Sequence, residues 1–210
     1  MIVGSILENR EFEKRIAVTP DIIKKYKSIG LNVCLTKGYG FHLGIDDQEF
    51  LKEGAEILDN DNEVIAKSNL IVQLNLLDEG VLKNLNQGKT LIGVLDSYQN
   101  KDKILDLTKK KINNFSLELL PRITRAQSMD ILSSQANLAG YKAVIDSFSY
   151  FEKAIPMMMT AAGTVPAAKV LVVGAGVAGL QAIATAKRLG AIVSATDVRL
   201  TAKEQVESLG

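Results

Sequence analysis

A glycine-rich turn is the clearest chemical motif in this chain. Residues 174–179 read G-A-G-V-A-G, follow the apolar run at 170–173 and open an apolar helical stretch. An acidic residue, Asp197, stands 18 residues after Gly179, at the end of the next predicted strand. The glycines alone would be weak evidence. A strand, a G-x-G-x-x-G turn, a helix and a distal acid together are typical of a dinucleotide-binding unit.

Each part of this motif has an expected task. Gly174 permits the tight turn, Gly176 lets the backbone approach a pyrophosphate, and Gly179 allows close packing of helix on strand. The helix N-terminus supplies amide donors and a partial positive charge to the phosphates. Asp197 would bind both hydroxyls of a ribose and repel a 2′-phosphate, which favours NAD(H) over NADP(H), although Arg199 weakens that preference. The alternatives are a flavin site or a nucleotide-free turn of the same shape.

A second group of polar residues lies in or beside an irregular loop at the start of a predicted long helix. An Arg and Asp pair there could hold an amide-bearing ring such as nicotinamide in place. Spacing alone favours a structural interpretation, in which Ser128 caps the helix, Asp130 complements its dipole and the arginines are solvated. The residues of this group are Arg122, Arg125, Gln127, Asp130 and Ser133.

Other reactive groups are sparse. The chain has 210 residues with one Cys and one His, which excludes an intramolecular disulfide, a Cys-based zinc site and a His cluster, so no metal site is predicted. Cys34 is expected to be a buried strand residue and His42 a loop residue. The 25 basic and 24 acidic side chains leave a net charge of +1, which excludes a basic nucleic-acid-binding protein.

Short apolar runs alternate with helical ones, which predicts parallel β-α-β units. Strands are expected over 2–6, 33–35, 70–74, 90–95 and 111–117, a helix capped by Thr19, a helix opened by Asp46 or Asp47, a long helix over 128–154 and a small-residue linker over 157–166. The fold class is therefore α/β with two domains. A doubly wound parallel-sheet N-terminal domain covers 1–127, a linker helix and connector 128–168, and the first half of a Rossmann NAD-binding domain 169–210.

No targeting or membrane-spanning segment is predicted. The N-terminal apolar run is short and soon meets acidic residues, unlike a signal peptide. The most apolar stretch, 154–186, is divided by Lys169 and interrupted by Pro and Gly, whereas a spanning helix needs about 20 uninterrupted residues. The chain is expected to be cytoplasmic, although it could serve a membrane partner.

Two segments carry a resemblance to a known family. Residues 118–147, ELLPRITRAQSMDILSSQANLAGYKAVIDS, and 156–191, PMMMTAAGTVPAAKVLVVGAGVAGLQAIATAKRLGA, resemble the NAD(H)-binding α subunit of proton-translocating NAD(P) transhydrogenase. The run RIAVTP at 15–20 fits the wider superfamily that includes alanine dehydrogenase. The resemblance spans the whole chain. Because family members continue well beyond the position of Gly210, we expect a C-terminally truncated or split form.

This resemblance implies direct hydride transfer between NADH and NADP⁺, driven by proton flow. NAD(H) is the cofactor of this chain, and NADP(H) is bound on a partner domain, the β subunit. The implied partners are that subunit, the transhydrogenase membrane domain and a second copy in a homodimer, in the cytoplasm and peripheral to the inner membrane. No acid–base residue is required, so catalysis is mostly positioning.

The resemblance also assigns residues to the two ends of the dinucleotide. It reverses the structural interpretation of the loop and gives its polar side chains to the nicotinamide end. That end comprises Arg122, Gln127, Ser128, Met129, Asp130 and Ser133, with Arg122, Gln127, Asp130 and Ser133 as the catalytic positioning group. The adenosine and pyrophosphate end comprises Gly174, Gly176, Val177, Gly179, Asp197, Val198 and Arg199.

Two alternatives are weighed against this assignment. Alanine dehydrogenase has a similar fold but uses a Lys and a His at its substrate site. Here Asn75 stands about where the Lys is expected, and Asp96 follows the next strand with no His nearby, which argues against amino-acid oxidation. The second alternative is a non-catalytic remnant that only associates, through an exposed strand edge at 191–196.

Overall fold

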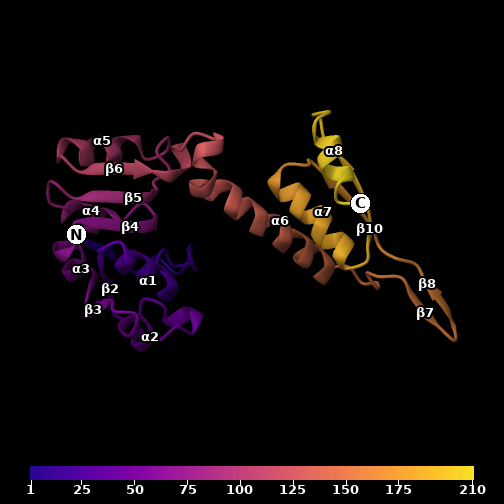
Figure 1. Cartoon of the computed structure of the whole chain (residues 1–210), viewed down its shortest axis with the longest axis horizontal. Helices are drawn as coiled ribbons and strands as arrows, with labels where there is room; N and C mark the ends of the chain where they lie inside the picture. Colours follow the sequence, from indigo (N-terminus) through magenta and orange to yellow (C-terminus); the bar gives the residue numbers. More distant parts are fainter. The chain divides into compact units, whose positions relative to one another are not determined.

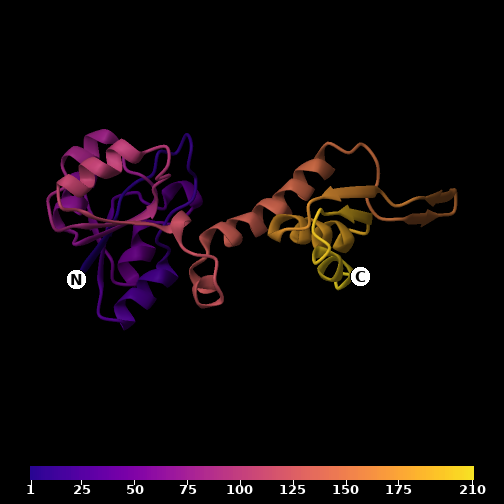
Figure 2. The same ribbon diagram turned by 90° about the horizontal axis from the view of Figure 1, so that it is seen from above.

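The computed structural model describes all 210 residues, which form two compact units, Met1–Met129 and Asp130–Gly210. Both units combine helices with parallel strands (Figures 1 and 2). The predicted α/β class is therefore confirmed.

The first unit contains a six-stranded sheet in the order β3-β2-β1-β4-β5-β6. Every strand pairing in it is parallel. This is the strand order of a doubly wound domain, in which β1 and β4 meet at the topological switch point. The strands are β1 (Ile2–Ser5), β2 (Asn32–Thr36), β3 (Glu56–Leu58), β4 (Leu70–Asn75), β5 (Thr90–Val94) and β6 (Asn113–Ser116).

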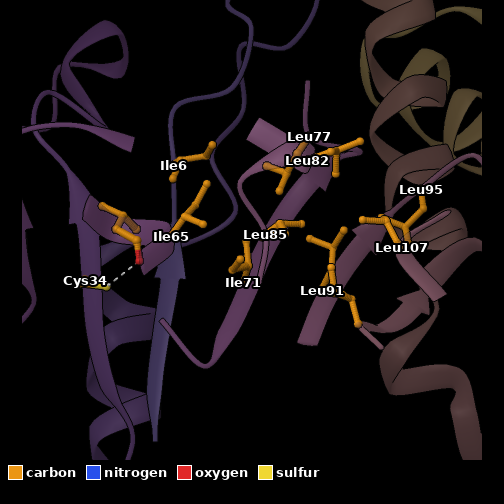
Figure 3. Close-up of a cluster of buried hydrophobic side chains, with 12 residues drawn as sticks. Ile6, Cys34, Ile65, Ile71, Leu77, Leu82, Leu85, Leu91, Leu95 and Leu107 are labelled. Atoms are coloured by element: carbon orange, nitrogen blue, oxygen red, sulfur yellow. Dashed lines mark hydrogen bonds between the residues drawn. The ribbon is translucent and has the colours of Figure 1, made fainter. Parts of the chain in front are cut away.

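Helices cover both faces of this sheet because alternate residues of each strand point to opposite sides. Val33 and Leu35 of β2 join a core with α1 (Pro20–Ser28) and α2 (Asp47–Lys52). Cys34 points to the other core, which α3 (Asp61–Lys67), α4 (Glu79–Lys83) and α5 (Lys101–Lys109) help to form. Figure 3 shows this second cluster. Cys34 is fully buried, as predicted.

Two local predictions for the first unit need correction and one is confirmed. Strand β3 was not predicted, because it has three residues and begins with a charged one. Thr19 precedes α1 but its side chain makes no capping hydrogen bond, so Pro20 at the first helical position marks the start. Asp46 does open α2, in a reciprocal capping box with Glu49.

The second unit holds a β-α-β unit followed by a short helix. Strands β9 (Lys169–Val173) and β10 (Ile192–Thr196) pair in parallel and are connected by α7 (Val177–Arg188), and α8 (Ala202–Glu207) follows. The long helix α6 is Ile131–Ser149, shorter than predicted at both ends, and lies beside α7 (Figure 1). Their shared core contains Val144, Ala186 and Ala191. This is the predicted first half of a Rossmann fold.

The segment predicted as a small-residue linker is instead a β-hairpin. Strands β7 (Met158–Thr160) and β8 (Gly163–Val165) pair antiparallel across a tight turn. Gly163 has a φ of 136°, a conformation that glycine adopts without strain, and so closes the turn. The Met run therefore forms a strand, with Met159 78% exposed. In neither unit does a helix combine the length and the apolar character needed to cross a membrane.

A buried lysine ties the end of α3 to the sheet. Lys89 is 8% exposed, and its Nζ donates hydrogen bonds to the carbonyl oxygens of Ile65 (2.6 Å), Ala66 (3.1 Å) and Ser68 (2.6 Å). Burial lowers the pKa of Lys89. Three carbonyls at the C-terminus of α3 thus depend on one ammonium group.

We predict that Lys89→Met lowers the free energy of unfolding by about 2–3 kcal/mol, because buried carbonyls lose charge-assisted partners. The exposed Lys101→Met at the start of α5 is the control and should change it by less than about 0.5 kcal/mol. Urea denaturation measures both variants. Equal unfolding midpoints for the two would contradict this account of Lys89.

Candidate functional site

The turn between β9 and α7 is built on glycine geometry. Gly174 has a φ of 96°, in the region where L side chains are strained, and its N–H donates to the carbonyl of Thr196 at 2.7 Å. A Cβ on Gly179 would collide with the Gly174 carbonyl oxygen and lie 2.8 Å from its carbon. Two of the three glycines are therefore required by the fold itself.

Gly176 differs from the other two glycines. Its φ of −77° and ψ of −168° are extended values that any residue can adopt. A Cβ built on Gly176 would meet no atom within 4 Å. Neither backbone strain nor packing within the chain explains the absence of a side chain at this position.

The N-terminus of α7 carries an uncompensated partial charge. The helix has no side-chain cap and no acidic residue in its first turn. Its first backbone amides have no acceptor in that turn, and twelve aligned peptide units give this end a positive dipole. Val177, at the first helical position, is 45% exposed. The turn thus offers hydrogen-bond donors to a negatively charged group.

Asp197 lies beside this turn, at the end of β10. Its Oδ2 accepts a hydrogen bond of 2.7 Å from the N–H of Ala175. Its Oδ1 accepts from the N–H and the Nε of Arg199, at 2.8 and 3.0 Å. The Arg199 guanidinium holds the pKa of this carboxyl well below its usual range. Both carboxylate oxygens are therefore engaged by this chain, and the Asp197 side chain is 10% exposed.

Arg199 has a larger place in the site than the sequence indicated. Its Nη2 donates to Oδ2 of Asp197 at 3.1 Å and to the carbonyl of Ala175 at 3.3 Å. It thus joins the end of β10 to the glycine turn. A ribose hydroxyl that approached Asp197 would have to replace these Arg199 contacts. Val198, beside it, is fully exposed.

The start of α6 brings two predicted residues together. Asp130 is the N-cap, and its carboxylate accepts from the N–H of Ser133 at 2.9 Å and from the Ser133 hydroxyl at 2.6 Å. The structural alternative that gave the cap to Ser128 is therefore wrong. Ser128 lies in the short 3-10 helix Thr124–Met129, at the end of the first unit.

The remaining loop residues also belong to the first unit. Arg122 precedes that 3-10 helix, and Arg125, Gln127, Ser128 and Met129 lie within it. All five are exposed. The side chains of Arg122 and Gln127 make no hydrogen bond within this unit, unlike Asp130 and Ser133 in the second. Their assignment to a nicotinamide stays a prediction.

Glu118 is a residue of this region that the sequence analysis did not single out. Its carboxylate accepts hydrogen bonds from the N–H groups of Leu95 (3.2 Å) and Ser97 (3.0 Å), after β5. Burial opposes its ionisation, but these hydrogen bonds leave its pKa lowered. Glu118 thereby anchors the chain just before the loop that carries Arg122. The only sequence signal was an acid directly before that loop.

The switch point of the first unit has different chemistry. A cavity of about 290 Å³ lies there, lined in part by Glu8, Glu13 and Asn75. The Asn75 amide lies 3.4 Å from an oxygen of each Glu, and Glu13 is paired with Arg15 at 2.6 Å, which lowers the pKa of Glu13 to about 2. No glycine-rich turn follows β1. Carboxylates at this position disfavour a phosphate, so the dinucleotide fingerprint is confined to the second unit.

The fold and its glycine turn define an α/β protein of the dinucleotide-binding class. The model of the alanine dehydrogenase/PNT N-terminal domain matches residues 5–139, and that of the C-terminal domain of the same family matches residues 143–210. The chain belongs to the alanine dehydrogenase/PNT family.

Known relatives place it within this family. The first of the polypeptides that make up NAD(P) transhydrogenase subunit alpha of Rhodospirillum rubrum is 49% identical over 208 residues, which cover 97% of this chain and 54% of that protein. The crystal structure of transhydrogenase from Sinorhizobium meliloti matches with a TM-score of 0.94 at 49% identity, over 100% of this chain and 63% of that one. Alanine dehydrogenase of Methanococcus maripaludis is 28% identical over 94% of this chain and 53% of that protein. The chain thus spans about half the length of the curated relatives it matches.

We predict that Asp197→Ala weakens NADH binding by about 1.5–3 kcal/mol, the range for hydrogen bonds to a charged group. Fluorescence titration with NADH measures the change. Glu207→Ala, an exposed acid on α8, is the control and should bind as the unchanged chain does. Unchanged affinity in Asp197→Ala would contradict the ribose assignment.

Proposed function

We propose that this chain is the NAD(H)-binding part of a proton-translocating NAD(P) transhydrogenase. The observation that carries the proposal is Gly176, a glycine where the fold has no need of one. Glycine costs the folded state about 0.5–1 kcal/mol in backbone entropy, so its presence calls for another reason. Close approach of a ligand phosphate to the backbone is such a reason.

The proposed binding mode uses three features of the second unit. The pyrophosphate lies against Gly176 and accepts hydrogen bonds from the first amides of α7, where the helix dipole is favourable. The adenosine ribose binds Asp197 in exchange for the Arg199 contacts. A 2′-phosphate would meet a carboxylate there, so NADH is preferred over NADPH.

The nicotinamide end is proposed to lie with the loop residues. Arg122, Gln127, Asp130 and Ser133 hold the ring in one orientation, and the hydrogen bonds between Ser133 and Asp130 keep the acid in place. NADH supplies a hydride that passes directly to NADP⁺ on a partner domain, the β subunit. The residues of this chain therefore orient and need transfer no proton. The names of the similar proteins, NAD(P) transhydrogenase subunits alpha, support this proposal.

We further propose that the chain works beside a membrane. Its partners are a transhydrogenase membrane domain and the β subunit that binds NADP(H), and proton flow through the membrane domain drives the reaction. The chain lies on the cytoplasmic side, peripheral to the inner membrane. A homodimer is supported by the exposed apolar side chains of the β7–β8 hairpin, Met158, Met159 and Val165.

The test is a fluorescence titration with NADH and with NADPH, using the unchanged chain and Gly176→Ala. We predict saturable binding of NADH and little binding of NADPH by the unchanged chain. Gly176→Ala should keep or slightly raise stability, by about 0.4–1 kcal/mol, because its backbone suits alanine. It should bind NADH at least about tenfold more weakly, since a methyl group occupies the phosphate position and even one lost hydrogen bond to a charged group is worth that much.

Gly174→Ala supplies the comparison. Its positive φ predicts destabilisation of about 1 kcal/mol or more, so it separates a structural glycine from a ligand-contacting one. Undiminished NADH binding by Gly176→Ala, or no NADH binding by the folded unchanged chain, would contradict the proposal.

A further inference from the structure

Gly140, in the middle of α6, is buried at the crossing with α7. A Cβ on Gly140 would collide with the carbonyl oxygen of Ala178 and lie 2.8 Å from its carbonyl carbon. Ala178 is in the first turn of α7, directly after the glycine turn. The atoms in the way belong to backbone, which cannot move aside as a flexible side chain could. The two helices therefore approach as closely as a glycine allows.

The neighbouring contacts show that α6 and α7 run in the same direction. One turn beyond Gly140, Val144 joins a core with Ala182 and Ala186, which lie one and two turns beyond Ala178. Steps of four residues on both helices thus meet in the same order. Because Gly140 faces the start of α7, the first two turns of α6 extend past that start (Figure 1).

This extension carries Asp130 and Ser133 away from the phosphate turn by a set distance. Ser133 precedes Gly140 by seven residues, about 10 Å along a helix. Leu132 and Leu138, on the extending part, are 38% and 57% exposed, so little packing within the second unit holds it sideways. The position of Ser133 relative to the turn therefore depends on helix rigidity and on the crossing at Gly140.

We infer that Gly140 is a positioning residue that sets the spacing between the two ends of the dinucleotide site. The inference rests on the proposed function, because Asp130 and Ser133 serve the nicotinamide end only in that proposal. A side chain at Gly140 forces α6 and α7 apart and shifts Asp130 and Ser133 relative to Gly176. The adenosine end, which is held by β9, α7 and β10, stays intact.

The experiment compares NADH with ADP-ribose, which lacks the nicotinamide ring, as ligands of the 210-residue chain. For Gly140→Ala we expect NADH affinity to fall about tenfold, the equivalent of one hydrogen bond to a charged group, with ADP-ribose affinity unchanged. Gly80→Ala is the control, since Gly80 is a helical glycine in α4 with no atom within 4 Å of an added Cβ. It should bind both ligands as the unchanged chain does.

A second variant keeps the inference testable if Gly140→Ala does not fold. Deletion of the exposed Asn137 leaves the Gly140 crossing but turns Asp130 and Ser133 by about 100° around the helix axis. It should likewise weaken NADH and spare ADP-ribose. Equal loss of both ligands, or loss of neither, in the folded variants would overturn the inference. An unchanged chain that binds neither ligand would instead contradict the proposed function.

Discussion

The close approach of backbone to backbone in the turn between β9 and α7 is the constraint on which the second unit depends. Because Gly179 has no side chain, the first turn of α7 can lie against the carbonyl of Gly174. The helix therefore begins directly off the strand, with its free amides and positive dipole end beside Gly176. The parallel return of β10 then brings Asp197 to the N–H of Ala175. One local geometry thus assembles donors, open backbone and an acid in one place.

The two units share a folding principle and differ in chemistry. The first has the full strand order of a doubly wound domain, yet the end of β1 leads to Glu8 instead of glycines. Burial raises the pKa of Glu8, while its carboxylate accepts a 2.6 Å hydrogen bond from the N–H of Leu74. A side chain of the chain itself thus occupies part of the switch-point crevice. The strand order alone does not make a dinucleotide site, because the loop after the first strand decides it.

Patterns with a strict local cause could be predicted from the sequence. Five of the six strands of the first unit follow from apolar runs that are buried on both faces, and the turn follows from glycine spacing. Strand β3 could not, since its pairing with β2 comes from the sheet and not from its own three residues. The hairpin at Met158–Val165 was missed for a related reason, because its side chains are exposed and show no buried alternation.

Side-chain partnerships in the candidate site were harder to predict than its position. The fingerprint located Asp197, but the sequence could not show that Arg199 engages both of its oxygens, because that depends on rotamers and on the path of the chain after β10. Likewise, Ser128 and Asp130 are both good capping residues. Only the end of the 3-10 helix at Met129 shows that Asp130 is the cap.

The most direct test of the central claim is an NMR titration of the chain with NADH that follows backbone amide chemical shifts. The claim is that the amides at the start of α7 bind the dinucleotide. It predicts the largest shifts at Gly176, Val177 and Ala178, together with Asp197 and Arg199, and small shifts at the crevice between β1 and β4. Shifts concentrated around Glu8 and Asn75, with the glycine turn unaffected, would contradict it.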